Sequence, residues 1–256
     1  MDVKVKITNK DEVLKIYTDE NGFHIPTISM RALNLTADQV KEALVEEMRR
    51  TFDRPVPYTL NAPYVKYASK TNLTARVLLR EFGGKSRSEK YLLTQVHGGG
   101  RGLKSFESAL RKIGTLPDGM YAVPGQKAPM NAYGNINPGF IVQILSYFRA
   151  FGEQGYKANI TDKGKARLAK GGKAKRGIRY FAIRTREGNL APGIYRKTSF
   201  AFGNAIEPMI MFVKRPSYRQ LLKWDQVAQG VIDRNWEANF KQASEGVVLW
   251  GKGYGG

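Results

Sequence analysis

The sequence of 256 residues contains no cysteine and only two histidines. The lack of cysteine excludes disulfide bonds, thiolate metal sites and cysteine nucleophiles, and it fits folding in a reducing cytoplasm. No apolar stretch reaches the roughly 18 residues that a membrane-spanning helix needs, and the N-terminal segment has no signal-peptide core. We therefore expect a soluble chain with no membrane partner, no cofactor and no transition-metal site, while a magnesium site built from carboxylates alone stays open.

Acidic residues are also scarce, because 22 Asp and Glu stand against 42 Lys and Arg, a formal net charge of +20. Between positions 163 and 186, ten residues are cationic, none is acidic, and glycines are frequent. Such a stretch favours a mobile basic loop over residues 163–177, which would become ordered only when it binds nucleic acid or an acidic protein surface. The candidates for binding a partner or DNA are Lys163, Lys165, Arg167, Lys170, Lys173, Lys175, Arg176 and Arg179.

Hydrophobic residues make up 42% of the chain, enough to bury a sizeable core. Capping-box spacing at Thr36 and Gln39 predicts a helix over residues 37–52, and Asn137 followed by Pro138 predicts the start of another. A third helical pattern lies beyond Pro216. Runs rich in Tyr, Val, Ile and Phe predict a hairpin within 58–81 and strands at 177–184, 192–195 and 208–213.

These elements predict one α+β domain over residues 1–256, with a mostly antiparallel sheet flanked by several helices and with long loops. The prediction includes an N-terminal arm over residues 1–30 and a C-terminal tail over residues 246–256. The tail opens with a short apolar cluster before a glycine-rich end, which indicates anchoring on a neighbouring molecule. The candidate oligomer contacts are Val248, Leu249 and Trp250.

Motifs that carry chemistry are weak in this sequence. His97 precedes three glycines, as in the oxyanion loop of some hydrolases, but no GxSxG nucleophile motif accompanies it. The simpler interpretation is that these glycines form a sharp turn before a short helix around Leu103 to Ile113. Aromatic residues among the cations, Tyr180 and Phe181, are more often core residues than base-stacking platforms. We expect no enzymatic activity.

Three segments together resemble the lambdoid minor tail protein Z and tail-completion family of tailed phages. They are VHGGGR with the following LKSFESAL, PGFIVQILSYFRAF, and PGIY followed by PMIMFVKRPSY. The likeness extends from Arg49 to Phe240. It implies a structural virion protein of the neck or upper tail, which forms a homo-oligomeric ring at the head–tail junction after assembly in the host cytoplasm. Its neighbours would be portal, adaptor or tail subunits, and no catalytic residue comes with the likeness.

Two further hypotheses remain open. In one, the chain is a non-specific DNA-binding accessory protein of assembly or packaging. In the other, it is a small hydrolase that depends on His97. If the protein belongs to a neck, we expect the basic segment to contact acidic protein, with packaged DNA as the second interpretation. A conduit lined with cations would bind the phosphate backbone and impede DNA ejection.

Overall fold

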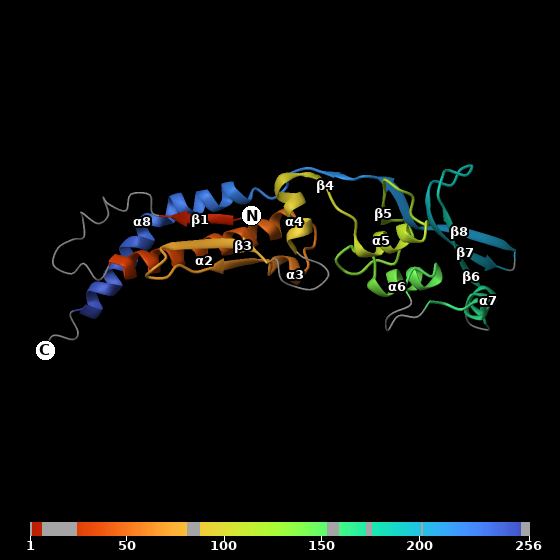
Figure 1. The fold of residues 1–256 in the computed structure, drawn as a ribbon, viewed down its shortest axis with the longest axis horizontal. Coiled ribbons are helices and arrows are strands. Elements are labelled where there is room, and N and C mark those ends of the chain that lie inside the picture. Colours follow the sequence, from red (N-terminus) through yellow and green to blue (C-terminus); the bar gives the residue numbers. More distant parts are fainter. Residues whose placement is uncertain are drawn as a thin grey trace. The chain divides into compact units, whose positions relative to one another are not determined.

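The computed structural model describes residues 2–6, 25–80, 88–152, 159–172, 176–200 and 202–251, of which 2–6, 88–90 and 246–251 are described by their backbone alone. Internal contacts divide the chain into two compact units (Figure 1). Unit 1 combines Met1–Gly99 with Arg219–Gly256, and unit 2 is the intervening segment Gly100–Tyr218. The sequence predicted one domain without this boundary. No local sequence signal shows that residues 100–218 form their own core, while the segments before and after them share a second core.

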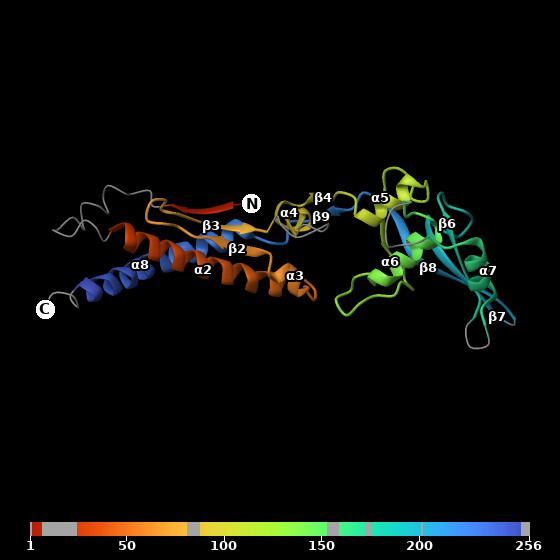
Figure 2. The same ribbon diagram turned by 60° about the horizontal axis from the view of Figure 1, so that its bottom comes forward.

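Unit 1 is built on two long antiparallel helices that lie side by side (Figure 2). A three-stranded antiparallel sheet of order β1-β3-β2 packs against them. Alternate residues of its central strand, including Val77 and Leu79, are buried against Leu33, Leu44 and Met48 of the first long helix. The elements are β1 (Asp2–Lys6), α2 (Ile25–Thr51), α3 (Pro57–Leu60), β2 (Pro63–Lys66), β3 (Thr74–Leu79), α4 (Ser88–His97) and α8 (Trp224–Gly251).

The interface between α2 and α8 contains a buried polar layer. Asn239 donates from Nδ2 to Thr36 Oγ1 at 2.9 Å and to Gln39 Oε1 at 2.8 Å, and Gln39 Nε2 donates back to Asn239 Oδ1 at 3.2 Å. Thr36 itself donates to the carbonyl of Ala32 at 2.8 Å. Because each polar atom needs its partner across the interface, this layer fixes how the two helices are aligned along their axes.

Unit 2 contains a four-stranded antiparallel sheet of order β5-β8-β7-β6. Residues of its three helices pack in one core with alternate residues of the strands, among them Tyr180, Ile194 and Ile210. Because these strand residues point to the same side of the sheet, the helices cover a single face of it. The elements are α5 (Ser105–Lys112), β5 (Met120–Pro124), α6 (Pro138–Tyr147), α7 (Asp162–Lys170), β6 (Ile178–Ile183), β7 (Gly193–Phe200), β8 (Gly203–Lys214) and β9 (Ser217–Tyr218). Strand β4 (Gly99–Gly100), which begins with the last residue of the first segment of unit 1, pairs with β9 in a two-stranded sheet.

The predicted α+β class and antiparallel pairing are confirmed, and so is the helix that begins at Pro138, where Asn137 Oδ1 accepts from the amide of Gly139 at 2.8 Å. The predicted capping box at Thr36 is wrong, because α2 begins at Ile25 and Thr36 is buried in its middle. Residues 25–30 of the predicted arm are therefore helical, and Asp2–Lys6 pairs with β3. The predicted tail is wrong over residues 246–251, where α8 continues.

Candidate partner-binding surface

The positive charge of the chain is concentrated in unit 2. This unit has 21 cationic and 6 acidic residues, a net charge of +15, whereas unit 1 has 21 and 16, a net charge of +5. Four of the six acids form ion pairs with cations of the same unit. These pairs are Glu107 with Arg101, Glu207 with Arg196, Asp162 with Arg149, and Asp118 with Arg111. Unit 2 therefore presents a strongly cationic surface.

The predicted basic loop over residues 163–177 is wrong for its first half, because α7 occupies Asp162–Lys170. Thr161 caps this helix by accepting from the amide of Gly164 at 3.1 Å, and Asp162 in the first turn complements the helix dipole. Leu168 packs against the core of unit 2, as does Ile160 just before the helix. The N-terminal cap and the apolar contacts of Leu168 thus outweigh the repulsion among the cations of α7, most of which are exposed to water.

The predicted candidates on α7 take two positions. Lys163, Arg167 and Lys170 are exposed and are spaced by four and three residues, so they form one stripe along the helix. Lys165 is half-buried, and its Nζ lies 4.9 Å from the centre of the Tyr147 ring. A cation over an aromatic face is favourable, so Lys165 helps to hold α7 on α6.

The remaining candidates lie at and beyond the end of α7. Arg176 is exposed, and its guanidinium carbon lies 4.3 Å from the centre of the Phe200 ring. Arg179 is exposed on β6 directly opposite Lys197 of β7. Like charges opposite each other in a sheet are unfavourable unless an anion compensates them. Lys173 and Lys175 lie outside the described residues.

The glycine between α7 and β6 is required by close packing. A Cβ atom on Gly177 would lie 2.0 Å from the carbonyl oxygen of Ala169, a distance that no side chain tolerates. Gly177 therefore lets the chain turn back against α7 and start β6, and the amide of Ser199 donates to its carbonyl at 3.1 Å. This turn places the cationic stripe of α7 next to the edge strand β6.

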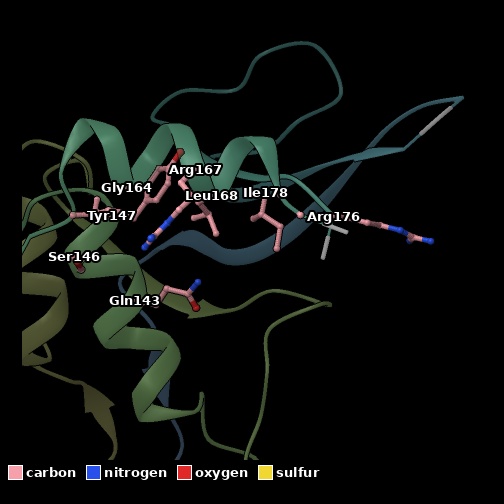
Figure 3. Close-up of a pocket in the computed structure, with 11 residues that line it drawn as sticks. Gln143, Ser146, Tyr147, Gly164, Arg167, Leu168, Arg176 and Ile178 are labelled. Carbon is pink, nitrogen blue, oxygen red and sulfur yellow. The ribbon is translucent and has the colours of Figure 1, made fainter. Parts of the chain in front are cut away.

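A groove of about 640 Å³ lies between α6, α7 and the start of β6, open to solvent on one side. Figure 3 shows Arg167 and Leu168 of α7 and Gln143 of α6 pointing into it, whereas Arg176 extends away from it. Among the described residues that line it, two are arginines and none is acidic; they are Gln143, Ser146, Tyr147, Ile160, Gly164, Arg167, Leu168, Gly171, Gly172, Arg176 and Ile178. Sequence reasoning missed this groove, although the four-residue spacing of Ile160, Gly164 and Leu168 was a signal for an inward helix face.

The turn expected after His97 is present, with positive φ at Gly98 (74°) and Gly99 (90°). His97 is exposed at the end of α4, and the side chain that this motif buries is Arg101, which donates to both carboxylate oxygens of Glu107 at 2.6 Å. Burial raises the pKa of Glu107, but Arg101 and the amides of Lys104 and Ala122 outweigh it and hold that pKa below its usual range. The aromatic residues also pack as expected, since Tyr180 is buried and Phe181 stacks on Tyr195.

The candidate oligomer contacts Val248, Leu249 and Trp250 fall in the last turns of α8, and their side chains lie outside the described residues. Within the described parts of the chain, no group of three or more His, Asp or Glu side chains is placed to hold a metal ion. No described helix combines the length and apolar character that crossing a membrane requires. Comparison with protein-family models, curated proteins and solved structures found no match for this chain.

Proposed function

We propose that this protein is a structural virion protein of a tailed phage, a ring-forming subunit of the neck or tail-completion type or a minor tail subunit. Two observations support the proposal. The first is the likeness of the VHGGGR, PGFIVQILSYFRAF and PMIMFVKRPSY segments to the minor tail protein Z and tail-completion family. The second, which carries the most weight physically, is the concentration of positive charge on unit 2.

In this function, unit 2 attaches the subunit to an acidic surface of a portal, adaptor or tail protein. Its own acids are largely engaged in internal ion pairs, so its cations attract an anionic partner over a distance limited by salt. Copies of the chain assemble into a ring by contacts of the terminal helix and of neighbouring sheet edges. Non-enzymatic adhesion within the particle is the proposed role.

Crosslinking in intact phage particles tests this proposal. We expect an amine-reactive reagent to join Lys170, which is exposed at the end of α7, to another virion protein. Deletion of the gene is expected to give heads and tails that fail to join stably, and the purified protein is expected to form rings or to bind its neighbours. Normal infectious particles from the deletion mutant would contradict the proposal.

DNA binding is the second candidate function, and the opposed cations Arg179 and Lys197 favour it because a phosphate could compensate both. It predicts that the free protein binds duplex DNA with an affinity that falls steeply as salt is raised. Exclusive DNA adducts from Lys170 in particles would support this function over docking to protein.

A further inference from the structure

The groove between α6, α7 and β6 differs from a simple cationic surface. Its walls include the half-exposed apolar side chains of Ile160, Leu168 and Ile178, next to the buried Tyr147 ring. A surface that only neutralises phosphates gains nothing from exposing these side chains to water. The groove is therefore suited to a ligand that brings apolar groups as well as negative charge.

Charge surrounds these apolar walls on the side of α7. Arg167 points into the groove from the middle of α7 (Figure 3), and Lys163 and Lys170 continue its stripe in both directions along the helix. No acid is among the lining residues that the structure describes. A ligand in the groove thus has apolar contacts along its floor and cations along one border.

We propose that this groove binds an extended acidic peptide segment that inserts a large apolar side chain between α6 and α7. The inference rests on the proposed function, because a neighbouring virion protein would supply that segment. Carboxylates of the segment would lie along Lys163, Arg167 and Lys170, while its apolar side chain would contact Leu168 and Ile178. The open side of the groove lets a chain enter and leave, which an enclosed small-molecule cavity would not.

The apolar walls favour a peptide over duplex DNA. A duplex presents phosphates and sugars on its outside and keeps the faces of its bases stacked, so it cannot place an apolar side chain beside Leu168. An acidic peptide satisfies both parts of the groove at once. Long-range charge would bring the segment to unit 2, and the apolar anchor would decide which segment stays bound.

Binding of two matched synthetic peptides to the full-length protein tests the inference. Both peptides are fluorescein-labelled and carry the same number of glutamates; one has leucines between them, and the other has serines in their place. By fluorescence anisotropy we expect the leucine peptide to bind at least about tenfold more tightly, the gain from burying one leucine side chain. Equal affinities for the two peptides would overturn the inference.

A blocking variant locates the binding. Gln143 is exposed and lines the groove from α6, so Gln143→Trp fills the groove without altering the core or the charge. We expect it to remove the preference for leucine, whereas Gln226→Trp, at an exposed position of α8 in unit 1, is expected to leave it unchanged. Circular dichroism checks that both variants fold. If folded Gln143→Trp still bound the leucine peptide more tightly than the serine peptide, the leucine would bind outside the groove and the inference would be refuted.

A matched charge reversal separates this inference from the proposed function. Arg167→Glu and Arg184→Glu change the charge equally, but Arg184 is exposed beyond the far end of β6, about 20 Å from Ile178 along the strand. We expect Arg167→Glu to weaken leucine-peptide binding at least about fivefold more than Arg184→Glu. Equal losses of affinity in the two variants would refute peptide binding in the groove but leave charge-driven docking of unit 2 intact. If duplex DNA displaced the peptide from the parent protein, and Gln143→Trp abolished this competition, the groove would be assigned to DNA instead.

Discussion

The buried ion pair between Arg101 and Glu107 makes a sharp prediction about unit 2. The Glu107 carboxylate is fully buried and accepts four hydrogen bonds, two from the Arg101 guanidinium at 2.6 Å and one each from the amides of Lys104 at 2.6 Å and Ala122 at 2.8 Å. It thereby ties the start of α5 to strand β5. We predict that Glu107→Gln strongly destabilises unit 2 although it changes the side chain by one polar group.

The expected magnitude follows from these four donors. A glutamine carbonyl can accept only part of them, and its NH2 group would face donors in place of an acceptor. The Arg101 charge, about 10% exposed, would lose its counter-ion. Removing one member of a buried pair costs about 3–5 kcal/mol, a large part of the about 5–15 kcal/mol that stabilises a typical domain. Replacing both residues, as in Arg101→Met with Glu107→Leu, should cost less than Glu107→Gln alone.

Hydrogen exchange of the β8 amides at neutral pH measures the free energy of opening of unit 2 in each variant. Asp118→Asn is the matched control, because Asp118 pairs with Arg111 at 3.6 Å but is 97% exposed, and its loss should cost less than about 1 kcal/mol. The reasoning would be refuted if Glu107→Gln lowered the free energy of opening no more than Asp118→Asn does.

Three further predictions concern the α2–α8 interface, the turn between α7 and β6, and the acid dependence of Glu107. Asn239→Ala removes the centre of the α2–α8 polar layer and should lower the free energy of unfolding by about 1–3 kcal/mol in urea titrations; an unchanged midpoint would contradict the role of that layer. Gly177→Ala should increase proteolysis around α7, whereas Gly172→Ala, whose Cβ would meet nothing within 4 Å, should not. Because the folded-state pKa of Glu107 is lowered, its ionised carboxylate contributes stability above pH 4.5, and this contribution is lost as the pH falls through the lowered pKa. In acid titrations, the stability of Glu107→Gln should therefore fall less steeply than that of the parent protein. Parallel curves of stability against pH would disprove the assignment.

Local signals in the sequence predicted those elements whose ends are set by their own residues. Asn137 and Pro138 define the start of α6 by a side-chain cap and a fixed φ, and neither depends on distant parts of the chain. The hairpin of β2 and β3 was predictable for the same reason, since alternation of apolar residues shows which side of a strand is buried. Both cases need information from only a few neighbouring residues.

Prediction failed where a distant partner decides the local structure. Thr36 and Gln39 have the spacing of a helix cap, but Asn239, 203 residues away from Thr36, uses both as partners within the helix interface. The charge of the basic segment suggested a loop, but the contact of Leu168 with the core of unit 2, together with the local Thr161 cap, stabilises it as α7. The groove is formed by α6 and β6 together with α7, so its combination of apolar walls and cations exists only once these three elements pack together.

The two properties of unit 2 have different ranges, and this bears on what a partner must offer. The charge excess acts over roughly a Debye length, about 8–10 Å at physiological salt, so it attracts any acidic surface with little discrimination. The groove beside Arg167 and Leu168 acts only on contact, and it favours a partner whose acidic residues are interrupted by an apolar one. A protein that needed only to hold DNA would require the first property alone. The presence of both on unit 2 is the reason for favouring a protein segment as the ligand of this surface.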